Sequence, residues 1–298
     1  MGKTWFITGS SSGIGLGIAK AVLAQGDNAV VMARDAAKLG SLVQQYPQNA
    51  LAVSLELTDR NSIHRAVQVA QDRFGSIDVL VNNAGHGYRA AVEEGEDEAV
   101  AELYGTNLFG PIELIKAVLP QMRERHSGAI INLSSIAAVQ SGVGSGYYAS
   151  TKAALELLSD ALYQEVSPLG IKVMVVEPGA FRTRFFDDSL KGTQVKIGDY
   201  AETAGKTRKE NIQNLHDQPG DPDRGGKIIV ETIQREDYPR TLLLGSGAVQ
   251  FVRDVLRKKL DEIEKWADVS AQSDFDQKDS EVSDTLLAEK RYSNPAGE

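Results

Sequence analysis

The sequence of 298 residues predicts an α/β fold in which a doubly wound, seven-stranded parallel sheet forms a single large domain. Short apolar runs rich in β-branched residues alternate with longer segments of helical periodicity. This alternation is typical of βαβ units whose sheet is covered on both faces. A glycine-rich turn joins the first apolar run to the first helical segment, as in doubly wound folds that bind nucleotides.

The individual elements follow from these patterns. The apolar runs predict strands at residues 5–8, 29–33, 51–55, 79–82, 129–133, 173–177 and 241–244. Helical spacing predicts helices at 14–25, 62–74, 99–123, 148–167 and 225–235. Because each strand but the last precedes a helix or a long connection, the strands are expected to be parallel.

Two regions depart from this rhythm. Residues 1–250 are expected to form the Rossmann-type domain, in which the polar, irregular segment of about 184–222, with a short helix at 201–215, covers the substrate as a lid. Residues 251–298 are expected to form a C-terminal helix and an acidic tail. The charges alternate over 258–265, which favours an exposed helix, whereas 268–298 is acidic, serine-rich and typical of a flexible tail.

Composition excludes several classes of function. A formal net charge of -9 disfavours nucleic acids and anionic membranes as partners. The absence of cysteine excludes disulfides and thiolate chemistry and fits a cytoplasmic protein. No apolar run approaches the ~18 residues of a membrane helix, and residues 1–8 do not resemble a secretory signal. The four histidines lack metal-ligand spacing, so no metal site is expected. The acidic stretch 93–98 is interpreted as a solvated helix start, not a cation site.

The glycine-rich turn reads Thr-Gly-Ser-Ser-Ser-Gly-Ile-Gly over residues 8–15. Backbone N–H groups at the start of a helix, together with the helix dipole, hold a pyrophosphate at such a turn. The residues expected to bind the cofactor here are Gly9, Ser11, Ser12, Gly13, Ile14 and Gly15. The same residues also match G-x-S-x-G, the turn that carries a hydrolase nucleophile, with Ser11 as that nucleophile. A plain Gly/Ser turn is the third interpretation.

The end of the second predicted strand bears on the choice of cofactor. An acid at this point would accept hydrogen bonds from the adenosine ribose, but the sequence has Ala33 followed by Arg34. Because arginine can pair with a 2′-phosphate, NADP(H) is favoured and NAD(H) is possible. Asp35 would weaken or reverse this preference if it faced the ribose.

Tyr148 and Lys152 lie four residues apart at the start of a predicted helix, so both project from one face. An ammonium about 4 Å from a phenol contributes about 4 kcal/mol at an effective dielectric of about 20. We therefore expect Lys152 to lower the pKa of Tyr148 from near 10, with desolvation opposing it. Ser135 ends the fifth strand thirteen residues before Tyr148 and can donate to a substrate oxygen. Ser134 is the alternative, although strand alternation and the interval favour Ser135.

With these motifs the sequence resembles the classical short-chain dehydrogenase/reductase family. Further matches are Asn-Asn-Ala-Gly at 82–85, Asn107 in the long helix, and Pro-Gly-Ala-Phe-Arg-Thr at 178–183, so the resemblance covers about residues 3–250. The segment 175–183 and the long C-terminal part resemble the 17β-hydroxysteroid-dehydrogenase-like branch. A steroid substrate does not follow from that branch.

The resemblance implies roles for these residues. Asn83, Ala84 and Gly85 would line the ribose side of the cofactor, Pro178, Gly179 and Thr183 would hold the nicotinamide carboxamide, and Lys152 would also bind the nicotinamide ribose. Glu56, followed by Leu57, stands where the family often carries Asp, so both would lie beside the adenine ring. Asn107 would hold a water behind Lys152 as part of a proton relay, or merely cap or kink its helix. The helices at 99–123 and 148–167 would form subunit interfaces of a homodimer or homotetramer.

The predicted function is therefore an NADP(H)-preferring oxidoreductase that interconverts a carbonyl and a secondary alcohol on a small, hydrophobic substrate. The expected pocket residues are His86, Ile136, Val143, Tyr147, Ala180, Phe181 and Phe185. Two alternatives stay open: a non-catalytic protein that senses the nicotinamide cofactor, and a serine hydrolase that uses Ser11. Turnover of a ketone would exclude the cofactor-sensing protein, and ester cleavage without cofactor would indicate the hydrolase.

Overall fold

The computed structural model describes residues 2–185, 187, 189–213 and 217–275. The chain divides into two units, Met1–Val252 and Arg253–Glu298. The first unit contains every strand described below, and the described part of the second continues helix α9 (Ser246–Ala271). Of the helices described, none combines the length and apolar character that crossing a membrane requires.

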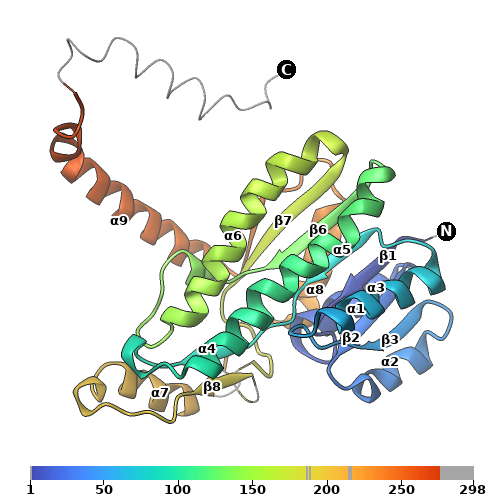
Figure 1. Cartoon of the computed structure of the whole chain (residues 1–298), viewed down its shortest axis with the longest axis horizontal. Helices are drawn as coiled ribbons and strands as arrows, with labels where there is room; N and C mark the ends of the chain where they lie inside the picture. The colour runs from blue at the N-terminus through green and yellow to red at the C-terminus, as the bar shows by residue number, and fades with distance from the viewer. Residues whose placement is uncertain (1, 186, 188, 214–216, 276–298) are drawn as a thin grey trace. The chain divides into compact units, whose positions relative to one another are not determined.

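Seven parallel strands form the central sheet, in the order β3-β2-β1-β4-β6-β7-β9 (Figure 1). Their bounds are β1 (Thr4–Ile7), β2 (Asn28–Ala33), β3 (Ala50–Ser54), β4 (Val79–Asn82), β6 (Gly128–Leu133), β7 (Ile171–Pro178) and β9 (Thr241–Leu244). The predicted doubly wound, seven-stranded parallel sheet is confirmed. The chain runs outward from β1 to β3 and then returns to the other side of β1, so the strand order reverses between β1 and β4. Folds of this kind bind ligands at such a reversal.

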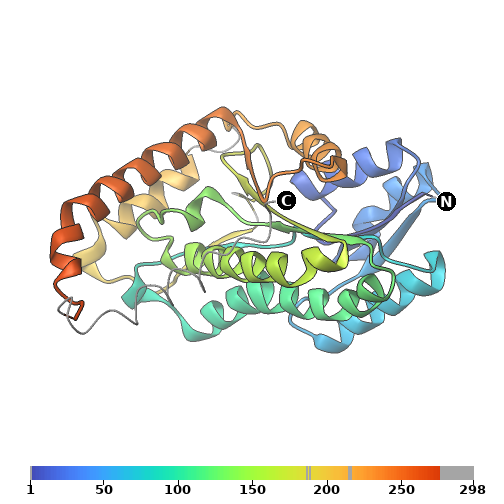
Figure 2. The ribbon, with the colours of Figure 1, turned by 90° about the horizontal axis from the view of Figure 1, so that it is seen from above.

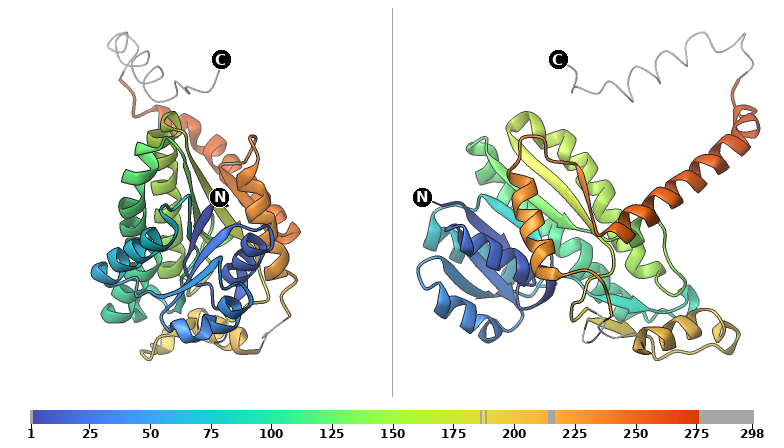
Figure 3. Two further views of the ribbon diagram at one scale, coloured as in Figure 1. Left: turned by 90° about the vertical axis from the view of Figure 1, so that its right-hand side faces the viewer. Right: turned by 180° about the vertical axis from the view of Figure 1, so that it is seen from behind.

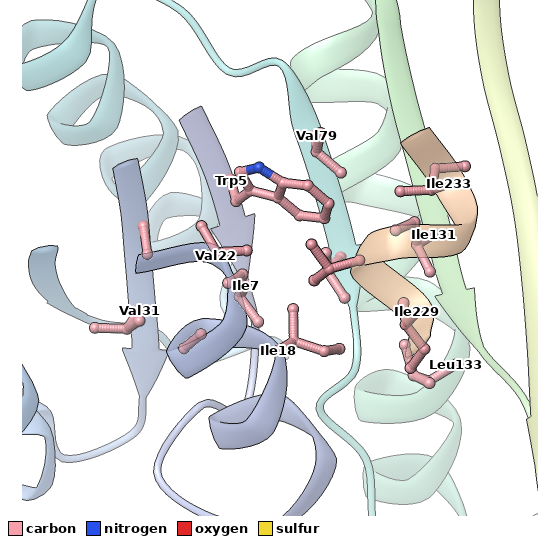
Figure 4. Close-up of a cluster of buried hydrophobic side chains, with 14 of the residues drawn as sticks. Trp5, Ile7, Ile18, Val22, Val31, Val79, Ile131, Leu133, Ile229 and Ile233 are labelled. Carbon is pink, nitrogen blue, oxygen red and sulfur yellow. The ribbon is translucent and has the colours of Figure 1, made fainter. Parts of the chain in front are cut away.

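Helices cover both faces of the sheet (Figures 2 and 3). On one face lie α1 (Gly13–Ala24), α2 (Gly40–Gln45) and α8 (Pro222–Gln234), and on the other lie α3 (Arg60–Phe74), α5 (Gly110–Glu124) and α6 (Gly146–Val166). Strand β1 supplies both cores because its side chains alternate: Trp5 and Ile7 join the first core, and Phe6 joins the second. Figure 4 shows the first core, where Trp5 and Ile7 lie among side chains of α1 and α8.

The predicted helix at 99–123 consists of three segments. Helix α4 (Asp97–Tyr104) is followed by one π-helical turn, Gly105–Phe109, and then by α5. π-helical turns are rare and often occur at functional sites because they displace side chains from the regular helical face. This one contains Asn107, which is completely buried.

Several short elements were not predicted. A second, two-stranded parallel sheet pairs β5 (Gly87–Arg89) with β8 (Leu190–Gly192), and α2 was missed because it has only six residues. Helix α7 (Ala204–Gln213) lies within the segment predicted at 201–215. Helix α9 runs to Ala271, so assigning 268–271 to a flexible tail was wrong, and the remainder of that predicted tail from residue 276 lies outside the described residues.

Candidate active site

A cavity of about 570 Å³ opens where the carboxyl ends of the central strands meet. It includes residues that follow β1, β2, β3, β4, β6 and β7, so the sheet itself gathers segments far apart in the sequence. The predicted site residues that line it are Gly9, Ser11, Ser12, Gly13, Ile14, Arg34, Glu56, Leu57, Asn83, Ala84, Gly85, His86, Ser135, Ile136, Tyr148, Lys152, Pro178, Gly179, Ala180, Phe181, Thr183 and Phe185. Four predicted residues do not line it: Gly15, Asn107, Val143 and Tyr147.

The glycine-rich turn forms one end of this cavity. Gly9 and Gly13 adopt φ values of 68° and 58°, a left-handed backbone that favours glycine. Helix α1 begins at Gly13, and Ser12 caps it without a side-chain hydrogen bond. The N–H groups of the first turn are therefore available to an anion in the cavity.

Gly15 supports this turn from behind the cavity. A Cβ atom at Gly15 would lie 2.4 Å from Nδ2 of Asn83. That nitrogen donates to the carbonyl oxygen of Thr8 at 2.8 Å. Because Gly15 has no side chain, Asn83 can approach closely enough to make this hydrogen bond with the turn. The prediction that Gly15 contacts the cofactor directly is not supported, because the residue packs against the protein instead.

Ser11 also lines the cavity, as the hydrolase interpretation requires. In the described part of the chain, however, no histidine or carboxylate is hydrogen-bonded to its hydroxyl. A serine nucleophile needs an adjacent base to remove its proton. The local structure therefore favours a phosphate-binding turn over a nucleophile.

Arg34 and Asp35 take different positions at the end of β2. Arg34 lines the cavity and its side chain is exposed. The carboxylate of Asp35 instead accepts the backbone N–H of Ala37 at 3.0 Å and caps the helical turn Ala36–Leu39, away from the lining. Glu56 lines the cavity while its carboxylate accepts both the N–H and the hydroxyl of Thr58.

Tyr148 and Ser135 meet at the other end of the cavity. Burial raises the pKa of Tyr148, while a hydrogen bond with the Ser135 hydroxyl and the positive charge of Arg89 oppose that rise. The expected lowering of this pKa was wrong, because desolvation outweighs the Ser135 hydrogen bond and the charge of Arg89. Tyr148 therefore holds its proton at neutral pH.

Lys152 lies behind the tyrosine, almost fully buried. Its ammonium donates to the carbonyl oxygen of Leu133 at 2.8 Å and lies 5.9 Å from the centroid of the Tyr148 ring. Burial lowers the pKa of Lys152 to about 8. A lysine with this pKa can exchange protons near physiological pH.

Asn107 lies behind Lys152 and fastens the backbone of His86. Its Oδ1 accepts the N–H of His86 at 3.0 Å, and its Nδ2 donates to the carbonyl oxygen of His86 at 2.9 Å. A Cβ at Gly85 would lie 3.1 Å from Asn107 Oδ1 and 3.4 Å from Lys152 Nζ, so only a glycine separates the two side chains. The role of Asn107 in a water relay stays a prediction.

Two buried carboxyl groups near Lys152 were missed by the sequence analysis. Glu156 Oε1 and Glu177 Oε2 are buried and have no hydrogen-bond partner. Burial, and then the charge of Glu156, raises the pKa of Glu177 to about 7. The only sequence signals were that Glu156 follows Lys152 by one helical turn and that Glu177 precedes Pro178.

Apolar side chains line the region in front of Tyr148. The ring of Phe185 lies 5.6 Å from that of Tyr148, centroid to centroid. Two predicted pocket residues do not line this cavity. Val143 is 57% exposed outside the cavity. Tyr147 packs against Tyr88 and donates its hydroxyl to the carbonyl oxygen of Val92, which directs it away from the lining.

The cavity also contains lining residues that the sequence analysis did not identify, several of which carry charge. They include Tyr88, Arg89, Glu102, Arg184, Ser189, Leu190 and Lys191. Most come from β5, β8 and the neighbouring residues, which the pairing of these short strands brings to the cavity. A charged residue three positions after His86 was the one available signal for Arg89.

The acidic stretch 93–98 is only in part the solvated helix start that was predicted: Asp97 and Glu98 are exposed in the first turn of α4, whereas Glu94 is not solvated. Glu94 is completely buried, accepts the N–H groups of Ala91 and Ile197, and forms an ion pair with Arg208 of α7. The Arg208 hydrogen bond is the main cause that lowers the pKa of Glu94 to about 2.

Glu96 makes equivalent contacts to the same part of the chain. Its carboxylate accepts the hydroxyl of Thr193 at 3.1 Å and the N–H of Gln194 at 3.0 Å. The hydroxyl of Tyr200 donates to Glu93 at 2.7 Å. The acidic stretch therefore binds residues 193–208, which belong to the segment predicted as a lid.

Comparison with known proteins gives consistent matches. Residues 3–194 match the family model described as short chain dehydrogenase. The chain is 34% identical over 280 residues to oxidoreductase BOA17 of Botryotinia fuckeliana (strain B05.10), covering 92% of this chain and all of that protein. Among solved structures, a short-chain dehydrogenase from Streptomyces avermitilis has a TM-score of 0.85 and 41% identity, covering 92% of this chain and 98% of that one.

A more distant structure is 3-ketoacyl-(acyl-carrier-protein) reductase from Brucella melitensis complexed with NADH. It has a TM-score of 0.69 and 25% identity, with 83% of this chain and 98% of that chain covered. The fold, the family model and a full-length relative thus agree, and the chain belongs to the short-chain dehydrogenase family as one of its oxidoreductases.

Proposed function

We propose that this oxidoreductase interconverts a carbonyl and a secondary alcohol with NADP(H), through Ser135, Tyr148 and Lys152. The observation that carries the proposal is one cavity with a phosphate-binding turn at one end and the hydrogen-bonded pair Tyr148–Ser135 at the other, beside Lys152. Such a cavity can hold an extended dinucleotide with its reactive ring beside a proton donor. The Brucella reductase, which bound NADH, supports a nicotinamide cofactor.

The residues present fit such a cofactor. The left-handed backbone at Gly9 and Gly13 leaves room for a pyrophosphate beside the first turn of α1, and Arg34 lines the adenosine end. Pro178, Gly179 and Thr183 would hold the nicotinamide end. When bound, the cofactor supplies the hydride for reduction or accepts it for oxidation.

In the direction of reduction, the protein residues act on the carbonyl oxygen. Ser135 donates a hydrogen bond to that oxygen and makes the carbonyl carbon a better hydride acceptor. Tyr148 then transfers its phenolic proton to the same oxygen. Because Lys152 has a pKa of about 8, its ammonium stabilises the phenolate that forms and can return a proton to it.

The preference for NADP(H) follows from Arg34 and Asp35. Arg34 lines the cavity, whereas the carboxylate of Asp35 is held by the turn that follows it. An anionic 2′-phosphate would therefore meet a guanidinium instead of a carboxylate. This arrangement favours NADP(H) over NAD(H).

Three wider expectations accompany this proposal. The segment of about 184–222 acts as a lid over the cavity, to which it contributes Arg184, Phe185 and Leu190. The enzyme is a homodimer or homotetramer, an assembly that would cover Phe109 and Leu157, which are 60% and 74% exposed. A cytoplasmic location, expected from the absence of cysteine, stays a prediction.

Substitution of the proton donor tests the proposed chemistry. Tyr148→Phe removes the phenolic hydroxyl, and we expect turnover of any ketone with NADPH to fall by about 10³-fold or more while NADPH fluorescence still reports binding. Tyr147→Phe is the matched control, because that neighbour lies outside the cavity lining and should keep near wild-type turnover. A Tyr148→Phe enzyme as active as the control would exclude Tyr148 as the donor.

A further inference from the structure

Arg89 is an unusual side chain for a pocket with apolar walls. It ends β5 and lines the cavity together with Tyr148 and Phe185. Its Nε atom is buried and has no hydrogen-bond partner. In the portion of the chain that the structure describes, no hydrogen bond or ion pair involves its guanidinium group. A buried donor without a partner indicates that a bound molecule completes it.

The other cationic residues of the cavity lining have partners or a different role. Lys191 forms an ion pair with Glu102 at 2.8 Å. Lys152 donates to the carbonyl oxygen of Leu133, and Arg184 also has an interaction partner. Arg34 lies at the adenosine end. Within the described lining, Arg89 is therefore the arginine or lysine available to a substrate.

The position of Arg89 relates it to the reacting end of the cavity. Its positive charge acts on Tyr148, the proposed proton donor, and burial lowers the pKa of Arg89 itself. Phe185 and Leu190 form apolar walls beside it, and a Cβ at Gly87 would lie within 2.9 Å of both side chains. These apolar walls offer the guanidinium no hydrogen-bond acceptor, so its burial is unfavourable until an anion binds it.

We propose that the substrate of this enzyme is a carbonyl compound that carries a carboxylate, which Arg89 binds. A guanidinium presents two parallel N–H donors that match the two oxygens of a carboxylate. One available cation balances one negative charge, which favours a carboxylate over a doubly charged phosphate. This inference rests on the proposed function and narrows the expected hydrophobic ketone to a keto acid with an apolar remainder.

The reaction is then the reduction of a keto acid to a hydroxy acid. A hydride from NADPH forms the new C–H bond at the carbonyl carbon, and the carbonyl π electrons move onto the oxygen. That oxygen takes the proton of Tyr148, and NADP⁺ is released. The carboxylate takes no part in bond making and stays paired with Arg89 throughout. Oxidation of the hydroxy acid by NADP⁺ is the reverse.

Matched pairs of acid and ester test this inference whatever the natural substrate is. The probes are benzoylformate, benzoylacetate and levulinate, each compared with its methyl ester, because they place the carboxylate at three distances from the ketone. For at least one pair we expect the wild-type enzyme to favour the acid in kcat/KM by about tenfold or more. Arg89→Met should lower kcat/KM for that acid by about a hundredfold and change that for its ester by less than about threefold.

Two further variants separate binding from other effects. Arg89→Lys keeps the charge without the planar fork and should recover part of the activity on the acid. Lys227→Met removes an exposed cation outside the cavity lining that also has an acidic partner, Glu231, and should leave the acid-to-ester ratio unchanged. Calorimetric titration with the corresponding hydroxy acid in the presence of NADP⁺ should show weaker binding to Arg89→Met and unchanged binding to Lys227→Met.

Equal losses of Arg89→Met on the acid and the ester would overturn the inference, since Arg89 would then act through Tyr148 or the fold. A wild-type enzyme that reduces every ester at least as well as its acid would also overturn it, while leaving the oxidoreductase proposal intact. A protein that binds neither NADPH nor NADH and reduces no carbonyl compound would instead reject the proposed function, and the inference with it.

Discussion

Individual buried polar residues give this site its chemistry. Lys152, Glu156 and Glu177 are ionisable side chains that become buried when the protein folds. Burial lowers the pKa of Lys152 and raises the pKa of both glutamates. Glu156 and Glu177 each have a buried oxygen without a partner. Burial of such a carboxylate costs stability unless the group keeps its proton.

The pKa of Glu177 makes stability depend on pH. Burial raises it from 4.5 to about 7, so between these values the folded protein binds more protons than the unfolded chain. The free energy of unfolding therefore falls as pH rises from about 5 to 8. In Glu177→Gln this contribution is absent, and we expect the variant to gain about 2 kcal/mol relative to wild type between pH 5 and pH 8.

Urea unfolding at the two pH values measures this difference. Glu165→Gln, an exposed position on α6, is the control and should follow the wild-type pH dependence. If Glu177→Gln and wild type lose stability in parallel as pH rises, Glu177 does not carry the effect.

The sequence predicts the residues of the site that belong to local motifs. Tyr148 and Lys152 are recognisable because one helical turn separates them, and the residues of the turn 8–15 because their glycines are close together in the chain. Arg89 and Glu177 were missed because their importance depends on burial and on neighbours that only the folded chain supplies. Tyr147 and Val143 were misplaced because proximity in sequence to Tyr148 does not fix which way a side chain points.

At the scale of elements, hydrogen bonds and an ion pair from the acidic stretch 93–98 hold residues 193–208 in place. Glu94 and Glu96 hold residues 193–208 through two backbone N–H groups, a threonine hydroxyl and Arg208. The preceding residues 189–191 line the cavity. The buried ion pair Glu94–Arg208 thus connects the acidic stretch to the proposed lid.

Breaking this ion pair is expected to release the segment. Arg208→Met leaves the buried carboxylate of Glu94 without its counterion, so we expect faster tryptic cleavage after Lys191, Lys196 or Lys206 and a KM for the ketone raised about tenfold. Glu94→Gln removes the charge and keeps an acceptor for Ile197, so its effect should be smaller. NADPH affinity should stay near wild type in both, because neither residue lines the cavity.

An exposed acid of the same stretch provides the control. Glu98→Gln changes the net charge equally, and it should leave both the cleavage rate and KM unchanged. Unchanged cleavage in Arg208→Met would mean that the remaining contacts of Glu96 and Glu93 hold the segment without the ion pair.

At the scale of the whole molecule, the seven-stranded sheet was predictable from the sequence, but the two-stranded sheet of β5 and β8 was not. Each of the seven central strands has at least four residues and is mostly apolar, which is a strong local signal. Strands β5 and β8 have three residues each and pair across about a hundred positions, so their pairing depends on the folded chain. The same pairing explains why the charged residues of the lining were unexpected.

Cofactor binding should stabilise the first unit as a whole, because the proposed site joins segments from six strands of one sheet. At a nucleotide concentration of about 100 times Kd, binding contributes about 2.7 kcal/mol, which corresponds to a Tm rise of about 5 to 10 °C for a domain of this size. With NADPH and NADH at equal concentrations, we expect the larger rise in Tm with NADPH.

In Arg34→Ala the rise in Tm with NADPH should fall to that with NADH. Lys38→Ala removes an exposed cation of the next turn outside the lining and should behave as wild type. Equal losses for both nucleotides in Arg34→Ala would show that the arginine serves the shared adenosine part and not the 2′-phosphate.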